Sequence, residues 1–398
     1  MAEALSSIRI SEGQTFSLGA DEADYLSRAL GGHLQPRPGG YVIQHLAGHL
    51  RLPKRTLILE SEKANGASLF SWMVFADPAL RRMRVLGSAS SSAQAGDASA
   101  IAARCFIDEL AQALRRYGLL RIYRSEKHRT ATIRGRIDFS ELTRSGGNLG
   151  KTPCVVWHRL PDTPLNRFLC AAVGVVEADP ILRSGNRSAL ASLPEVFVGV
   201  PPTIDPALER SSIRLARQEL GFANALAWAR LLISASGALE GQRLSGRSFI
   251  VNLDDLFEQA IVQSLKLAGI RHRPKRLLSY EAVAGERVES RSFQTDVFCH
   301  DPRFEPCVID AKYKHTVSSS NLQQLVTYCT LAGVTKGVVA MPASASVEAD
   351  HFRFTPAYGN PIEIAVVKFD TSGRSVEAWK HHAAGFVERL VGGWRQAA

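Results

Sequence analysis

The stretch VIDAKY, residues 308–313, decides the fold of the C-terminal part of this chain. In a strand, residues two positions apart point to the same face, so Asp310 and Lys312 share one face and the residues around them share the other. A tripeptide of the form D-x-K also fits a surface strand with a charged pair. Its meaning therefore depends on what the neighbouring segments bring beside it.

The preceding predicted strand carries a second carboxylate, Asp296. The segment DPRFEP, residues 301–306, reads as a turn-bearing connection between the two strands. A hairpin folded symmetrically about Arg303 places Asp296 directly opposite Asp310, about 4.5–5.5 Å away on the same face. Two carboxylates so close repel one another unless a divalent cation lies between them. A bulge would change this register, so the pairing is a hypothesis.

Two predicted helices bring further polar groups. The helix at residues 253–268 has an apolar stripe of Leu253, Phe257, Ile261 and Leu265. Glu258 lies at the margin of this stripe, where its carboxylate can reach past the core. Downstream, Gln324 and Tyr328 lie four residues apart on a helix and project together. We expect this pair to orient Lys312 or to contact a DNA phosphate.

Phosphodiester hydrolysis needs a cation that neutralises charge on the phosphate and generates hydroxide. Hard oxygen ligands hold Mg²⁺, and a lysine stabilises charge or helps to activate water. We therefore expect Asp296, Asp310 and Glu258 to be metal ligands, with Lys312 completing the catalytic set. The expected ion is Mg²⁺, with Mn²⁺ able to substitute, and either one or two ions fit.

The C-terminal part is expected to have an α/β fold, with a mixed sheet flanked by helices. Its predicted helices are 253–268, 321–332 and roughly 375–391, and its predicted strands are 293–299, 307–314, 337–341 and 362–369. Upstream, an α+β region has predicted strands at 41–43, 57–59, 119–123, 131–139 and 154–157, and predicted helices at 68–75, 100–117, 162–177 and 212–236. A flexible link at 87–99 and a Gly/Ser-rich break at 237–248 divide the chain into regions 1–100 (mainly β), 101–240 (α+β) and 241–398.

Composition restricts the class of protein. The six cysteines form no C-x-x-C pair, which argues against a zinc or iron–sulfur site. No apolar run approaches the ~18 residues of a membrane span, and no signal peptide is evident at the start, so a cytoplasmic protein without a membrane partner is expected. The formal net charge of +10 favours polyanionic partners.

The basic residues gather in two places. One group comprises Arg115, Arg116, Arg121, Arg124, Lys127, Arg129, Arg134 and Arg136. It fits either a solvated face or a contact with DNA or a partner protein. The other group, Arg271, Arg273, Lys275 and Arg276, directly follows the helix of Glu258 and is the expected DNA-binding set. We interpret four histidines as surface or satisfied polar groups rather than as ligands: His128, His158, His300 and His315. Asp301 is expected to solvate its turn.

At this point the chain resembles the McrC subunit of McrBC-type 5-methylcytosine restriction systems. The resemblance rests on LFE 256–258, TDV 295–297, VIDAKYK 308–314, QLVTY 324–328, RGRIDF 134–139 and DTPLN 162–166. It implies a PD-(D/E)XK nuclease domain at residues 241–398 that cuts double-stranded DNA. It also implies an N-terminal region, residues 1–100, that docks on a McrB-like AAA+ GTPase and stimulates it.

Two other functions stay open. A non-catalytic activator of an AAA+ motor would have lost cutting, but the intact set of Glu258, Asp296, Asp310 and Lys312 speaks against that loss. An autonomous RecB-like nuclease would need no motor, and the long N-terminal half disfavours it. The chain has no G-x-x-x-x-G-K-[ST] phosphate loop, so we expect it not to hydrolyse nucleotide itself.

Overall fold

The structure is a computed structural model that describes residues 6–52, 55–61, 66–77, 95–145, 151–183, 186–209, 215–237, 248–284, 287–314, 316–343, 351–355 and 359–393. The chain forms two compact units. One consists of Met1–Ile101 together with Gly237–Ala398, and the other of Ala102–Ser236. The first and third of the regions expected from the sequence thus cluster together. The finer three-region division by role stays a prediction.

A smaller sheet in the first unit joins segments far apart in the sequence. Its strands lie in the order β1 (Ser6–Ser11), β5 (Arg55–Glu60), β4 (Leu46–Arg51) and β9 (Phe249–Asn252). Strand β9 pairs antiparallel with β4, so the chain returns to the N-terminal sheet before it enters the C-terminal region. Helix α1 (Ala20–Leu30), the 3₁₀ turn η1 (Gly31–His33) and the hairpin of β2 (Leu34–Arg37) and β3 (Gly40–Ile43) complete this part.

The larger sheet carries the candidate site. Its order is β10 (His272–Pro274), β13 (Val297–Cys299), β14 (Cys307–Ala311), β15 (Lys336–Pro342), β17 (Ile362–Phe369) and β16 (His351–Phe354). Strands β14, β15 and β17 run parallel, and the other neighbours are antiparallel. The expected mixed sheet is therefore confirmed, with β10 and β16 as strands that the sequence did not predict.

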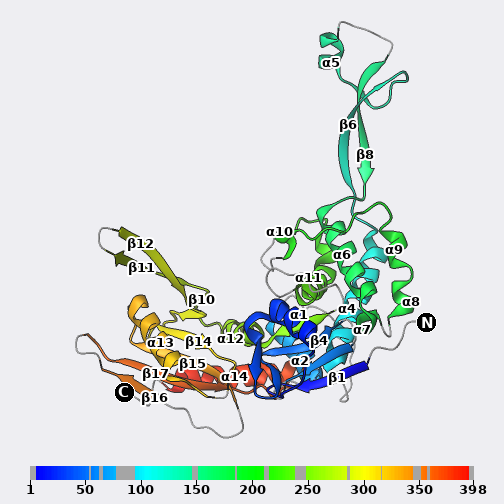
Figure 1. Ribbon diagram of the computed structural model, residues 1–398. Helices are drawn as coiled ribbons and strands as arrows, with labels where there is room; N and C mark the ends of the chain where they lie inside the picture. Colours follow the sequence, from blue (N-terminus) through cyan, green and yellow to red (C-terminus); the bar gives the residue numbers. More distant parts are fainter. Residues whose placement is uncertain are drawn as a thin grey trace. The chain divides into compact units, whose positions relative to one another are not determined.

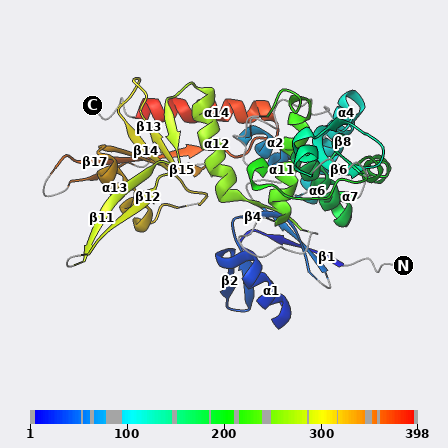
Figure 2. The same cartoon turned by 90° about the horizontal axis from the view of Figure 1, so that it is seen from above.

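Helices cover both faces of this sheet (Figure 2). Helix α13 (Ser319–Ala332) packs Leu325 and Cys329 against Val308 and Val339. Gly337 allows the close approach, because a Cβ there would lie 3.0 Å from the Cys329 sulfur. The opposite face receives α2 (Gly66–Ala76), α12 (Leu253–Leu267) and α14 (Val376–Gly393), whose rings meet Phe369 and one another. All four helices lie within two residues of the bounds expected for them, and α2 extends the predicted segment 68–75 by two residues at its start and one at its end.

One predicted strand is wrong in its length. The segment 293–299 divides into β12 (Arg287–Gln294) and β13, with Thr295 and Asp296 between them. Strand β12 pairs with β11 (Leu277–Ala284) in a hairpin arm that is drawn clearly in Figure 1. The expected strand 307–314 also ends early, at Ala311, although the Lys312 amide still donates to the Ala340 carbonyl at 2.8 Å.

The second unit combines helices with a long ribbon (Figure 1). Its helices are α4 (Ala95–Tyr117, which begins in the first unit), α6 (Pro164–Ala178), α11 (Ala223–Gly237), the 3₁₀ turn η2 (Leu220–Phe222) and the short α5 (Phe139–Arg144), α7 (Pro180–Arg183), α8 (Arg187–Leu190), α9 (Leu193–Val196) and α10 (Pro206–Glu209). Helix α6 begins as predicted, because the Thr163 hydroxyl accepts from the Asn166 amide at 3.1 Å.

Within the described residues, no helix has the length and apolar character that a membrane crossing requires.

The ribbon consists of β6 (Ile122–Thr130) and β8 (Thr152–Leu160), with β7 (Arg136–Ile137) on the far side of β8. The predicted strand 131–139 is wrong apart from β7, since the chain turns at Gly135 and α5 begins at Phe139. Gly135 has φ +77°, and a Cβ there would lie 2.3 Å from the Val155 carbonyl oxygen. The expected link 87–99 is also wrong at its end, where α4 begins at Ala95, and residues 87–94 lie outside the described residues.

Candidate active site

The hairpin of β13 and β14 brings two carboxylates to the same place. Val297 pairs with Ile309, Phe298 with Val308 and Cys299 with Cys307, so paired residues are placed symmetrically about position 303. The same register, continued by one residue, sets Asp296 opposite Asp310. The register expected from the sequence is confirmed. The Asp296 carboxylate also accepts a hydrogen bond of 2.8 Å from the Ala311 amide, which fixes its position at the end of β14.

Asp310 is buried and only half satisfied. Its side chain is 1 % exposed, and its Oδ1 lies 2.9 Å from the Lys312 ammonium. Its Oδ2 is buried and has no hydrogen-bond partner among the described residues. A buried carboxylate oxygen without a partner costs free energy unless a ligand satisfies it. Such an oxygen beside a second carboxylate has the chemistry that a cation site requires.

The pKa values of Asp310 and Lys312 show that one buried ammonium does not fully compensate two neighbouring carboxylates. Burial and the neighbouring Asp296 carboxylate together raise the pKa of Asp310 to about 6, and the Lys312 ammonium only partly opposes them. For Lys312, burial lowers the pKa, but Asp310, Asp296 and the Tyr328 phenol more than offset this, so its pKa lies above the usual value. Lys312 is therefore a cation at neutral pH.

Glu258 adds a third carboxylate from α12. The helix begins after Asn252, whose side chain accepts from the Asp254 amide at 2.9 Å, and Phe257 and Ile261 are fully buried. This packing leaves Glu258 at the margin of the buried stripe, with its side chain 14 % exposed. Burial raises the pKa of Glu258, and the Asp296 carboxylate adds to the shift. Glu258 and Asp296 are thus electrostatic neighbours.

Lys275 has a role that the sequence did not indicate. Its ammonium donates to Glu258 Oε2, whereas the sequence assigned it to DNA. Its backbone has φ +54°, the left-handed region that costs a non-glycine residue free energy. Its amide donates to the Asp296 carbonyl at 2.9 Å. One bend of the chain therefore positions Lys275 and Asp296 together. No local sequence signal marks this contact, because Lys275 and Glu258 lie 17 residues apart.

Gln324 and Tyr328 contact one another, as their helical spacing predicted. Gln324 Nε2 donates to the Tyr328 hydroxyl at 2.7 Å, and Tyr328 is buried. The Tyr328 phenol also contributes to raising the pKa of Lys312. On the opposite face of β14, the Tyr313 hydroxyl lies 2.8 Å from the Ser61 hydroxyl, and the Tyr313 ring packs against Trp72. These contacts anchor the strand that carries the site.

The other basic candidates line an edge of the same sheet. Arg273 lies on β10 and Arg271 immediately precedes it, and both are exposed. Arg276 follows β10, with its guanidinium 4.0 Å from the centre of the Phe298 ring. Next to these arginines, Asp301 corrects one expectation from the sequence, which was that its side chain only solvates the turn. Asp301 is buried, bonds the Arg271 amide at 2.8 Å, and has a pKa well below its usual range because Arg303 hydrogen-bonds it.

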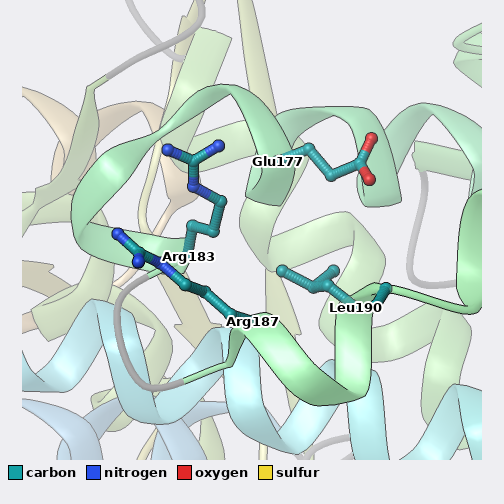
Figure 3. A pocket seen from close by; sticks show the side chains of 5 residues that line it. Glu177, Arg183, Arg187 and Leu190 are labelled. Atoms are coloured by element: carbon teal, nitrogen blue, oxygen red, sulfur yellow. The ribbon is translucent and has the colours of Figure 1, made fainter. Parts of the chain in front are cut away.

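Other expected groups lie away from these carboxylates. The basic stretch from Arg115 to Arg136 belongs to α4 and the ribbon of the second unit. That unit also holds a cavity of about 640 Å³ lined by Glu177, Arg183, Arg187, Leu190 and Ala191 (Figure 3). None of the candidate catalytic residues lines it. His300 stacks on Phe298, and His315 lies outside the described residues.

Comparisons with known proteins give one family. Residues 52–340 match the family model described as McrBC 5-methylcytosine restriction system component. A solved half-complex of Thermococcus gammatolerans McrB AAA+ hexamers with bound McrC contains a similar chain, with TM-score 0.60 and 16 % identity, covering 96 % of this chain and 100 % of that one. At this sequence identity, the likeness shows a similar fold and nothing more.

A second solved structure, the Thermococcus gammatolerans McrBC complex, matches with TM-score 0.44 and 18 % identity. The match covers 68 % of this chain and 90 % of that one. The search of curated proteins found no significant match.

Proposed function

The chain belongs to the family of McrBC 5-methylcytosine restriction system components, and we propose that it is the DNA-cutting subunit of such a system, a metal-dependent endonuclease. The family expectation from the sequence is confirmed by the match over residues 52–340. The order of α12, β13, β14, α13 and β15 agrees with the expected PD-(D/E)XK domain. We assign that domain to residues 241–398.

One observation carries the proposal: a buried carboxylate oxygen without a partner, in a cluster of three carboxylates. Asp310 Oδ2 is that atom, and Asp296 and Glu258 are its acidic neighbours. The fit to a hard divalent cation is good, because the groups on offer are oxygens and none is a thiolate or imidazole. We therefore propose Mg²⁺ as the cofactor, held by Asp296, Asp310 and Glu258, with Mn²⁺ able to replace it.

The roles of the side chains follow from their charges. A bound divalent cation supplies charge neutralisation at the phosphate and a water of lowered pKa. Lys312 stays protonated at neutral pH, so it stabilises negative charge on the phosphate rather than accepting a proton. Tyr328, held by Gln324, positions the Lys312 ammonium. When no cation is bound, the Lys275 ammonium fixes the Glu258 carboxylate, and the Lys275 backbone amide holds the Asp296 carbonyl.

Double-stranded DNA is the proposed substrate. Arg271, Arg273 and Arg276 lie on or beside β10, the edge strand next to β13. Guanidinium groups suit phosphate oxygens, because their donors match two oxygens at once. Contacts to phosphates position the duplex without reading its sequence. Lys275, engaged with Glu258, contributes positive charge to the same edge.

A McrB-like AAA+ GTPase is the proposed partner. In the Thermococcus gammatolerans assembly, McrC is bound to McrB AAA+ hexamers. We propose the same class of partner for this chain, with residues 1–100 docking on the motor and stimulating its GTP hydrolysis. Cutting in the cytoplasm would then depend on the motor. The alternatives, a scaffold without cutting activity and a nuclease that needs no motor, become outcomes of the test.

The test is cleavage of 5-methylcytosine-containing and unmodified duplex DNA in Mg²⁺ and GTP, with and without a McrB-like AAA+ GTPase. Wild type is compared with Asp310→Asn and with Glu377→Gln, a matched control that removes an exposed charge on α14. We expect cutting by wild type and the control only. Equal cutting by Asp310→Asn would refute the site. Full cutting activity without the partner would identify an autonomous nuclease. Stimulated GTP hydrolysis by the partner without any DNA cutting would identify a scaffold.

A further inference from the structure

A carboxylate and two imidazoles meet on one face of the β6–β8 ribbon: Glu126, His128 and His158. Glu126 and His128 are two residues apart on β6, so they point to the same face. His158 on β8 pairs with Arg124 and therefore shares that face, one step diagonally from Glu126. The cluster thus joins two strands whose register is fixed by the backbone.

The spacing of their donor atoms suits a metal ion. His128 Nε2 lies 3.1 Å and His158 Nε2 3.9 Å from Glu126 Oε2, and the set contains one donor atom of each residue within 4.8 Å of the others. Nitrogen and oxygen ligands bind Zn²⁺ at about 2.0–2.2 Å, which separates tetrahedral ligands by roughly 3.4 Å. Side-chain rotations bring the atoms to that spacing, because all three side chains are 44–47 % exposed.

We propose that Glu126, His128 and His158 form a binding site for a borderline transition-metal ion of the Zn²⁺ class. Two imidazoles and one carboxylate are ligands that suit Zn²⁺, Co²⁺ and Ni²⁺, whereas Mg²⁺ prefers oxygens alone. The site is therefore chemically distinct from the cluster of Asp296, Asp310 and Glu258. It is independent of the proposed nuclease function.

The basic side chains next to the cluster in sequence lie on the opposite face of the ribbon. Lys127 and Arg129 point to the other face, where their side chains lie 2.6 Å from Asp138 and 2.9 Å from Glu141 at α5. On the cluster face, Glu126 is the carboxylate that the two imidazoles approach. Arg124, opposite His158, brings a positive charge that weakens cation binding.

A bound ion would act as a clamp between the strands. Its ligands come from both β6 and β8, so binding ties the two strands together at the level of Glu126. An ion that binds only the folded ribbon also stabilises it by mass action. The projecting ribbon would then change stiffness with metal supply.

The test uses the full chain without a histidine tag, stripped of metal and kept in millimolar Mg²⁺ to fill the acidic site. Co²⁺ is titrated, and its visible absorption reports a site with imidazole ligands. We expect wild type to bind one Co²⁺ ion per chain at the ribbon. The control variant His351→Ala, which removes an exposed histidine on β16, should bind Co²⁺ in the same way. In His128→Ala and His158→Ala the affinity should fall at least about 100-fold, since even groups behind metal ligands contribute 10–100-fold.

Two further variants keep the result interpretable. Glu126→Gln retains the hydrogen-bonding shape but loses the anionic ligand, so it should also weaken Co²⁺ binding, and circular dichroism checks that each variant is folded. Asp310→Asn should bind Co²⁺ at the ribbon as wild type does, which separates this site from the nuclease site. Co²⁺ binding that is equal in wild type, His128→Ala and His158→Ala would overturn the proposal.

Discussion

Two clusters of charged side chains in this protein differ chiefly in burial. Asp296, Asp310 and Glu258 gather at the sheet with two raised pKa values and a buried oxygen that lacks a partner among the described residues. On the β6–β8 ribbon, Lys127 and Arg129 are exposed and paired with acids. Buried like charges cost stability, whereas exposed pairs cost little. Burial, rather than the number of charges, therefore supports the assignment of the nuclease site.

The largest expected effect is on catalysis. Lys312→Met should reduce the rate of Mg²⁺-dependent cleavage about a thousand-fold, because several kcal/mol of charge stabilisation are lost at about 1.36 kcal/mol per factor of ten. Single-turnover cleavage at saturating partner measures it. Lys380→Met, which removes an exposed lysine of α14, should cut like wild type. Loss of activity in both variants would mean that the assay reports general damage.

The next effect is on stability. Asp310→Asn should stabilise the metal-free protein at pH 8, by up to about 3 kcal/mol, because the pKa of Asp310 is raised from 3.8 to about 6 and each unit represents 1.36 kcal/mol. The native state holds this proton more tightly than the unfolded state, so wild-type stability falls as pH rises from about 4 through about 6. Denaturant unfolding in EDTA measures both effects. A destabilised Asp310→Asn protein at pH 8 would contradict the account.

The affinity for a divalent metal ion should depend on the protonation state of Asp310. A cation binds the ionised form of Asp310, whose pKa is about 6, so affinity should be constant at high pH. Below about pH 6 it should fall about tenfold per unit as a proton competes for the carboxylate. Calorimetric titration with Mn²⁺ between pH 5 and 8 gives the profile. A flat profile would show that Asp310 is not a ligand.

A smaller effect is expected at Lys275. Lys275→Met should destabilise the metal-free protein by about 1 kcal/mol, since Glu258 would lose its charged hydrogen-bond partner. Added Mg²⁺ should remove most of this deficit, because the cation takes over the role of the ammonium. Thermal unfolding in EDTA and in Mg²⁺ distinguishes the two states. The same deficit under both conditions would separate Lys275 from the metal site.

The smallest effect is expected on the ribbon. Lys127→Met should leave the thermal midpoint unchanged, because the Lys127 side chain is 69 % exposed and its pair with Asp138 therefore contributes little to stability. A large fall in the midpoint would show that exposed and buried charges do not differ as described.

Local rules predicted much of the site. The symmetric turn about Arg303 gave the pairing of β13 with β14, and the alternation of a strand placed Lys312 beside Asp310. Helical spacing brought Gln324 to Tyr328. These contacts depend on residues that are close in sequence or joined by one short turn. Their geometry is therefore set by the periods of strand and helix.

Contacts between distant segments could not be predicted. The pairing of β9 with β4 joins residues about 200 positions apart and unites the two ends of the chain in one unit. The bend that splits β12 from β13 depends on Lys275 and Arg276, whose backbones bond Asp296 and Thr295. The cluster of Glu126, His128 and His158 depends on a cross-strand register. No single segment contains that information.

The most direct test of the central claim is a Mn²⁺ titration of the full chain, followed by electron paramagnetic resonance, in wild type, Asp310→Asn and Glu377→Gln. The account predicts saturable binding in wild type and in Glu377→Gln, at least about 100-fold weaker binding in Asp310→Asn, and displacement by Mg²⁺. Equal binding by all three proteins would contradict it, because the buried carboxylate would then hold no metal.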